Sequence, residues 1–209
     1  IIPHRNPDGD ALGSALALKH FLEAKKHKVN IVSPNDYPTF LKWLPGESDI
    51  IKFSKTPGIA RDKINNAELI FGLDFNCLSR IQDLSEIVKK TKVDKIMIDH
   101  HESPEFFANI NYSDPSMSST CEMVYNIINA SDSKLLDKKI ACCLYTGIMT
   151  DTGSFRYPST TSKTHKVVSH LLSLGANGSE IHQKIFDSSS MSRITVSYTH
   201  LRAHETDRY

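Results

Sequence analysis

Short apolar runs alternate along the chain with longer segments in which apolar residues recur at helical spacing. Strand-like runs occur at 1–2, 29–33, 67–74 and 95–99. Helical spacing predicts helices at 11–27, 78–91, 118–130, 137–149, 163–174 and 178–187. Short apolar strands separated by helices are typical of a parallel sheet covered on both faces. The pattern therefore predicts an α/β fold with helices on both faces of a parallel sheet.

The periodic pattern ends near residue 187. We expect one domain over 1–187, with the beginning of its first strand missing, because the strand-like run at 1–2 starts abruptly. The Ser-rich stretch that follows predicts the start of a linker at 188–194. Residues 195–209 continue no apolar periodicity, so we interpret them as a non-native or disordered tail.

The first candidate site follows the run at 1–2. His4, Asp8 and Asp10 lie within one short segment, HRNPDGDALGS. A proline and a glycine in this turn allow it to fold both acids back toward His4. The N–H groups of the following helix face the same region, which favours anions. A turn in which Asp10 merely caps the helix is the alternative.

Further acids and histidines follow other predicted elements. Asp74 ends one apolar run, Asp99-His100-His101 ends another, and Asp151 lies in the small-residue turn of GIMTDTGSFR. Taken alone, Asp74 could be a helix cap, His100 and His101 could be a structural pair, and Asp151 could mark a helix stop. Because ligands of parallel sheets sit at the carboxyl ends of the strands, we expect these side chains to meet the first site there.

The combined donors favour a metal centre without cysteine. Imidazole and carboxylate ligands suit Mn²⁺, and Mg²⁺, Fe²⁺, Co²⁺ and Zn²⁺ remain open. Two divalent ions about 3.5–4 Å apart can activate a water and hold a phosphoryl group. Four ligand aspartates would cancel the charge of two such ions, so further cations are needed to attract phosphates. Arg156 is a candidate, and Arg5 and Arg80 are others.

Composition limits the partners. The chain carries 25 basic and 24 acidic residues, which argues against a large basic surface for duplex DNA. No stretch approaches the ~18 apolar residues of a membrane span. The four cysteines form no CxxC pair, so we expect free thiols and a cytoplasmic protein. A homodimer stays open.

Taken in order, HRNPDGDALGS, the acid of GLDFN, DHH and GIMTDTGSFRY resemble the motifs of the DHH phosphoesterase family. The resemblance runs from residue 1 to about 193. Within the family, NPDGDALGS, the segment Ser118-Ser119-Thr120 and TDTGSFRY are most similar to bacterial oligoribonuclease/pAp phosphatases, called nanoRNases.

The resemblance implies a Rossmann-like catalytic domain and two Mn²⁺ ions, with Mg²⁺ or Co²⁺ as alternatives. It assigns one ion to His4, Asp8 and Asp74, and the other to Asp10, Asp74, His100 and Asp151, with Asp74 bridging. His101 would contact the scissile phosphate or protonate the leaving group, and Asp99 would orient the histidines. It also implies a second, substrate-binding domain, which nothing in this sequence matches.

The resemblance implies hydrolysis of short oligoribonucleotides to mononucleotides, and of pAp to AMP. Predicted substrate contacts are Arg156, Ser119, Thr120 and Arg80. The alternatives are a cyclic or linear dinucleotide phosphodiesterase, a RecJ-like single-strand exonuclease, a pyrophosphatase, and a module that binds nucleotides without cleaving them. The last should have lost a metal ligand, and this chain keeps all of them.

Overall fold

Strands of the protein form one four-stranded and one two-stranded parallel sheet in the computed structural model, which describes residues 1–187. The larger sheet has the order β1 (Ile2–Pro3), β4 (Leu69–Leu73), β5 (Asp94–Asp99), β6 (Ile110–Ser113). The smaller sheet pairs β2 (Val32–Ser33) with β3 (Ile51–Lys52). The carboxyl ends of β1, β4 and β5 therefore lie at one edge. The linker and tail predicted at 188–194 and 195–209 lie outside the described residues.

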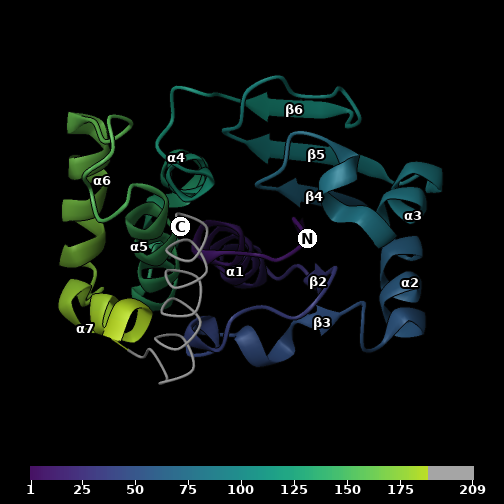
Figure 1. Cartoon of the computed structure of the whole chain (residues 1–209), viewed down its shortest axis with the longest axis horizontal. Coiled ribbons are helices and arrows are strands. Elements are labelled where there is room, and N and C mark those ends of the chain that lie inside the picture. The colour runs from purple at the N-terminus through teal and green to yellow at the C-terminus, as the bar shows by residue number, and fades with distance from the viewer. Residues whose placement is uncertain (188–209) are drawn as a thin grey trace, which may run out of the picture.

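Helices lie around the sheets and at both ends of the strands. The α-helices are α1 (Gly9–Ala24), α2 (Pro57–Asn65), α3 (Ser85–Lys90), α4 (Thr120–Asp132), α5 (Lys138–Asp151), α6 (Ser162–Ser173) and α7 (Gly178–His182). Short 3-10 helices occupy Thr39–Leu41, Glu47–Asp49, Leu78–Leu84 and Ser133–Leu135, and a π-helical turn spans Gln183–Asp187. In Figure 1, strands β4 to β6 point toward the side where α4 to α7 gather, and α2 and α3 lie at the opposite side.

The larger sheet has an apolar core on each face, as the alternation of buried residues predicts. Leu73 and Ile98 belong to the core that also contains apolar residues of α1, α4 and α5. Ile70 belongs to a second core with residues of α2 and α3, among them Ile64 and Val88. The predicted parallel sheet with helices on both faces is confirmed.

Glycines allow α1 to approach α5 closely, and the two helices pack against each other. A Cβ atom at Gly13 would lie 2.5 Å from the backbone oxygen of Cys143, and one at Gly147 would lie 2.8 Å from Asp10 Oδ1. Both distances are too short for a real methyl group. These glycines serve helix packing, which brings the start of α1 next to the end of α5.

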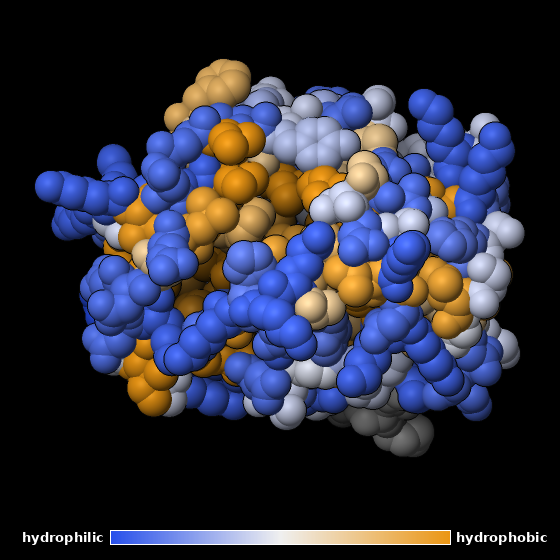
Figure 2. Space-filling model, turned by 180° about the vertical axis from the view of Figure 1, so that it is seen from behind, coloured by the Kyte–Doolittle hydropathy of each residue, from blue (hydrophilic) through white to orange (hydrophobic). Residues whose placement is uncertain are grey.

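An apolar hollow of about 720 Å³ lies at the amino ends of β1 and β4. Its lining includes Ile1, Val32, Ile64 and Leu69, and the space-filling view from behind shows an orange recess there (Figure 2). None of the predicted ligands lines it. No helix within residues 1–187 has the length and apolar character needed to cross a membrane.

Some predicted elements differ from the observed ones. The helix predicted at 78–91 is a 3-10 helix followed by α3, because Gln82 breaks the helix with φ 39°. The helix predicted at 11–27 ends at Ala24, and Lys26 has φ 72°. The strand predicted at 29–33 is only β2, and the predictions missed α2, β3 and β6.

Candidate metal centre

The turn after β1 brings His4 and Asp8 together. Its residue Asn6 has φ 55°, and the Asn35 side chain holds it by accepting from the Asn6 N–H and donating to Asn6 Oδ1, both at 2.7 Å. Asp8 caps α1, because its Oδ1 accepts two backbone N–H groups of the first turn at 3.0 Å. Asp8 Oδ2 lies 3.7 Å from His4 Nε2. The cap is therefore Asp8, and Asp10 is available for another role.

Asp10 is buried beneath the amino end of α4. Its Oδ2 accepts from the Thr120 N–H at 2.7 Å, and its Oδ1 accepts from the Cys121 N–H at 2.8 Å. These bonds offset the cost of burying a carboxylate, and the helix dipole acts in the same direction. Burial, with the charges of Asp74 and Asp151, still raises the pKa of Asp10 well above its usual value.

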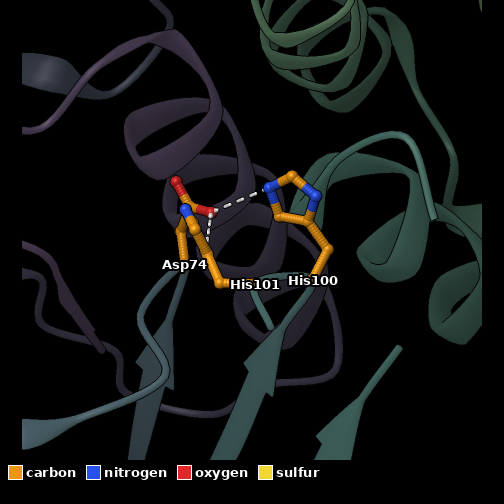
Figure 3. Close-up of side chains that lie close together, drawn as sticks. All are labelled: Asp74, His100 and His101. Carbon is orange, nitrogen blue, oxygen red and sulfur yellow. Dashed lines mark ion pairs between the residues drawn. The ribbon is translucent and has the colours of Figure 1, made fainter. Parts of the chain in front are cut away.

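Asp74 stands between two imidazoles. It follows β4 with φ 65°, an uncommon conformation outside glycine, and its N–H donates to the backbone oxygen of Ile98 at 3.0 Å. Asp74 Oδ2 lies 3.5 Å from His4 Nε2, and Oδ1 lies 3.6 Å from His100 Nε2. Figure 3 shows the second of these pairs. The two oxygens of one carboxylate thus face two different ligand groups.

His100 joins Asp74 to the acids of α1 and α5. Its Nε2 lies 3.2 Å from Asp151 Oδ2 and 3.8 Å from Asp10 Oδ2. Its Nδ1 lies 3.4 Å from the backbone oxygen of Met117. A carbonyl partner at Nδ1 favours the tautomer whose Nε2 lone pair is open to a ligand.

His101 is held by the buried carboxylate of Asp99. Its Nδ1 lies 2.7 Å from Asp99 Oδ1, and its backbone N–H donates to Asp99 Oδ2 at 3.0 Å. The bond to Asp99 raises the pKa of the His101 imidazole. His101 Nδ1 also lies 3.9 Å from Asp74 Oδ1 (Figure 3). Because Nδ1 is committed to Asp99, Nε2 is the nitrogen that can meet a substrate.

The donor set fits divalent cations. His4 Nδ1 is bonded to the Arg5 carbonyl at 2.8 Å, whereas its buried Nε2 has no hydrogen-bond partner among residues 1–187. Burial alone would lower the pKa of His4, but the carboxylates of Asp74 and Asp8 outweigh it and raise that pKa to about 10. A buried nitrogen without a hydrogen bond, beside two carboxylates, is a position that a divalent ion satisfies.

Three groups of side chains could each hold an ion, because their donor atoms lie within 4.8 Å of one another. They are His4 with Asp8 and Asp74, Asp10 with His100 and Asp151, and Asp74 with His100 and His101. The structure therefore brings all six predicted metal ligands into two adjoining groups that share Asp74 as a neighbour. Imidazole and carboxylate donors of this kind suit Mn²⁺, Mg²⁺ or Co²⁺.

The predicted substrate residues lie in different environments. Arg80 is half-buried, and its positive charge opposes the rise in the pKa of His101, which indicates that the two are close. Arg156 is exposed, and its Nε donates to the backbone oxygen of Gly153 at 2.7 Å. Ser119 and Thr120 are fully buried. Their burial disfavours the direct substrate contact that the sequence indicated.

Two contributions to the site were missed from the sequence. Asn35 fastens the turn that contains Asn6, and the Cys121 N–H binds Asp10. An asparagine in a Ser-Pro-Asn-Asp stretch is typical of any turn. A backbone N–H carries no sequence signal at all, so neither contribution could have been found without the structure.

Replacing Asp151 by Asn should change stability in opposite directions with and without divalent ions. Burial and the charges of Asp74 and Asp8 raise the pKa of Asp151 to about 6, although His100 opposes them. A carboxyl whose folded pKa lies above its unfolded value of 3.8 destabilises the fold above the folded pKa. With chelator near neutral pH, Asp151→Asn should therefore melt several degrees above the wild type.

That difference should shrink as the pH falls below about 6, because the folded wild type then binds the proton. Saturating Mn²⁺ should reverse the order, since the variant lacks a ligand. Thermal melts over this pH range measure both effects. A chelated wild type that melts above the variant at neutral pH would contradict the argument.

Comparison with known proteins places these residues in a family context. Residues 1–148 match the N-terminal domain of the DHH family. The bifunctional oligoribonuclease and PAP phosphatase NrnA of Thermus thermophilus is 31% identical over 185 residues, which cover 88% of this chain and 52% of that protein. The cyclic-di-AMP phosphodiesterase PdeA of Listeria monocytogenes is 29% identical, over 85% of this chain and 28% of that protein.

A solved structure agrees with the fold. The exopolyphosphatase-related protein of Bacteroides fragilis superposes with a TM-score of 0.90 and 42% identity, over 93% of this chain and 57% of that one. The chain spans about half the length of the NrnA relative. The match of the family domain over residues 1–148 covers most of the chain and contains every predicted metal ligand except Asp151. The proteins similar to this chain include phosphoesterases that act on nucleotides. The chain is a member of the DHH family.

Proposed function

We propose that this chain carries the catalytic domain of a dinuclear-metal phosphoesterase that hydrolyses short oligoribonucleotides to mononucleotides and pAp to AMP. The observation that carries the proposal is the placement of Asp74. One of its oxygens lies 3.5 Å from His4 Nε2 and the other lies 3.6 Å from His100 Nε2. A carboxylate shared in this way suits a pair of ions better than a single ion.

The metal ions, His101 with Asp99, and Arg80 would each have a separate role in hydrolysis. When bound, two divalent ions supply Lewis-acid polarisation of the phosphate and lower the pKa of a water. Asp99 holds the His101 ring through Nδ1, so that Nε2 can carry a proton toward the leaving oxygen. Arg80 adds positive charge near His101, where an anionic substrate would approach.

The substrate assignment rests on the relatives. The NrnA relative is named for oligoribonuclease and PAP phosphatase activity and aligns with 88% of this chain. PdeA, named for cyclic-di-AMP, supports a cyclic-dinucleotide phosphodiesterase as the second candidate. Because the NrnA relative is about twice as long, we propose that the whole protein has a further substrate-binding domain.

An assay with five substrates tests the proposal. The Mn²⁺-loaded chain is given a two- to five-residue RNA, pAp, a cyclic dinucleotide, pyrophosphate and bis(4-nitrophenyl) phosphate. The last is a small diester that needs only the metal centre. We expect turnover of the small diester by this chain, and preference for RNA and pAp when the rest of the protein is present.

The outcomes separate the candidates. Preference for the cyclic dinucleotide would favour the second candidate. If the metal-loaded protein hydrolysed none of the five substrates, the phosphoesterase proposal would be wrong and a binding module would stand in its place. For variants that replace a predicted metal ligand, Asp94→Asn is the matched control. Asp94 is an exposed acid at the amino end of β5, away from the ligands.

A further inference from the structure

Thr120 is bonded to two of the predicted metal ligands at once. Its hydroxyl donates to Asp74 Oδ1 at 2.9 Å, and its backbone N–H donates to Asp10 Oδ2 at 2.7 Å. Asp74 follows β4 and Asp10 lies in the first turn of α1. The first residue of α4 therefore connects acids from two elements that are far apart in sequence.

The bond to Thr120 fixes the orientation of the Asp74 carboxylate. The terminal torsion of an aspartate is broad, so an unbonded carboxylate turns over a wide range. With the hydroxyl on Oδ1, the other oxygen remains 3.5 Å from His4 Nε2 and Oδ1 remains 3.6 Å from His100 Nε2. Free rotation would remove one or both of these alignments.

The Thr120 hydroxyl is not required to form α4. Ser119 caps this helix, and its side chain accepts from the Glu122 N–H at 3.1 Å. Thr120 is fully buried, so its hydroxyl does not serve solubility or a surface contact either. Its hydrogen bond to Asp74 is the contact that remains to explain it.

We infer that Thr120 is a positioning residue, whose hydroxyl orients the Asp74 carboxylate between the two cation sites. This inference rests on the proposed dinuclear metal centre. Outer partners that orient metal ligands typically change metal affinity by about 10–100-fold when they are lost. The Thr120 hydroxyl should contribute within that range, whatever substrate the enzyme prefers.

The test compares variants that keep or lose the hydroxyl. Thr120→Val is close to threonine in shape and lacks the hydroxyl donor. Thr120→Ala also lacks the hydroxyl, and its smaller side chain cannot crowd Asp74. Thr120→Ser keeps the hydroxyl. Thr146→Val is the matched control, because Thr146 is equally buried and its hydroxyl donates to the Cys142 backbone oxygen. Calorimetric titration with Mn²⁺ measures the number of ions bound and their Kd, and thermal melts verify that each variant is folded.

We expect Mn²⁺ binding about 10–100-fold weaker in Thr120→Val and Thr120→Ala. Thr120→Ser and Thr146→Val should bind as the wild type does. If a folded variant without the hydroxyl takes up two ions at wild-type Kd, the inference is overturned and the dinuclear proposal stands. A wild type that takes up no Mn²⁺ would instead overturn the proposed function, and the role of Thr120 with it.

Discussion

Asp74→Asn should reduce phosphoester hydrolysis and Mn²⁺ affinity by more than about 100-fold, beyond the effect of losing an outer partner. The substitution removes a carboxylate charge that faces both His4 and His100, at 3.5 and 3.6 Å. It should preserve the fold, because asparagine tolerates the left-handed conformation that Asp74 adopts at φ 65°. Steady-state kinetics on the small diester, with Mn²⁺ titration, measure both losses.

The control for this change is Asp94→Asn in the same sheet. Asp94 starts β5 and is exposed, whereas Asp74 is buried at the carboxyl edge. Asp94→Asn should leave kinetics and metal binding unchanged. Near-wild-type turnover by folded Asp74→Asn would show that Asp74 holds no ion.

Gly147→Ala should lower the free energy of unfolding by about 1–3 kcal/mol, the usual cost of overpacking a core. A Cβ atom at this position would overlap Cys121 Sγ and lie 2.8 Å from Asp10 Oδ1. Helices α1, α4 and α5 meet there, so one of them must move. Because Asp10 and Asp151 belong to two of these helices, we also expect weaker Mn²⁺ binding.

Gly58→Ala provides the matched control, since Gly58 lies in α2 and a Cβ atom there meets nothing within 4 Å. That change should be neutral or slightly stabilising, because alanine favours the helix. Thermal or urea unfolding of both variants measures the difference. Equal stability of Gly147→Ala and the wild type would show that the helices have room to separate.

The long apolar elements could be predicted from the sequence. Apolar runs ending in Asp74 and Asp99 correspond to β4 and β5, and the helix predicted at 137–149 corresponds to α5 at Lys138–Asp151. Parallel topology then explains why acids following separate strands meet at one edge. This rule needs only the order of the elements along the chain. The sequence alone could therefore predict that these ligands meet at one end of the strands.

Elements with few buried side chains could not be predicted. In α2 only Ala60 and Ile64 are buried, and β3 has two residues, so neither shows a clear period. Strand β6 reads Ile-Asn-Tyr-Ser and lacks a buried residue, because it lies at the edge of the sheet. Such elements are determined by the neighbours against which they pack.

The supporting contacts of the site were also beyond the sequence. The family resemblance implies substrate contacts for Ser119 and Thr120, yet both are buried and Thr120 contacts predicted metal ligands. Whether a hydroxyl faces a substrate or a carboxylate depends on long-range packing, which local pattern does not encode.

The bonds between Asp10 and the amino end of α4 join positions 110 and 111 residues apart. During synthesis, α1 leaves the ribosome long before α4 has been made. At that stage the Asp10 carboxylate still lacks its N–H partners in α4. The cation centre is completed only after the last turn of α5, with Asp151, has left the ribosome. Nascent chains shorter than this should be unable to assemble the ion site that contains Asp10, His100 and Asp151.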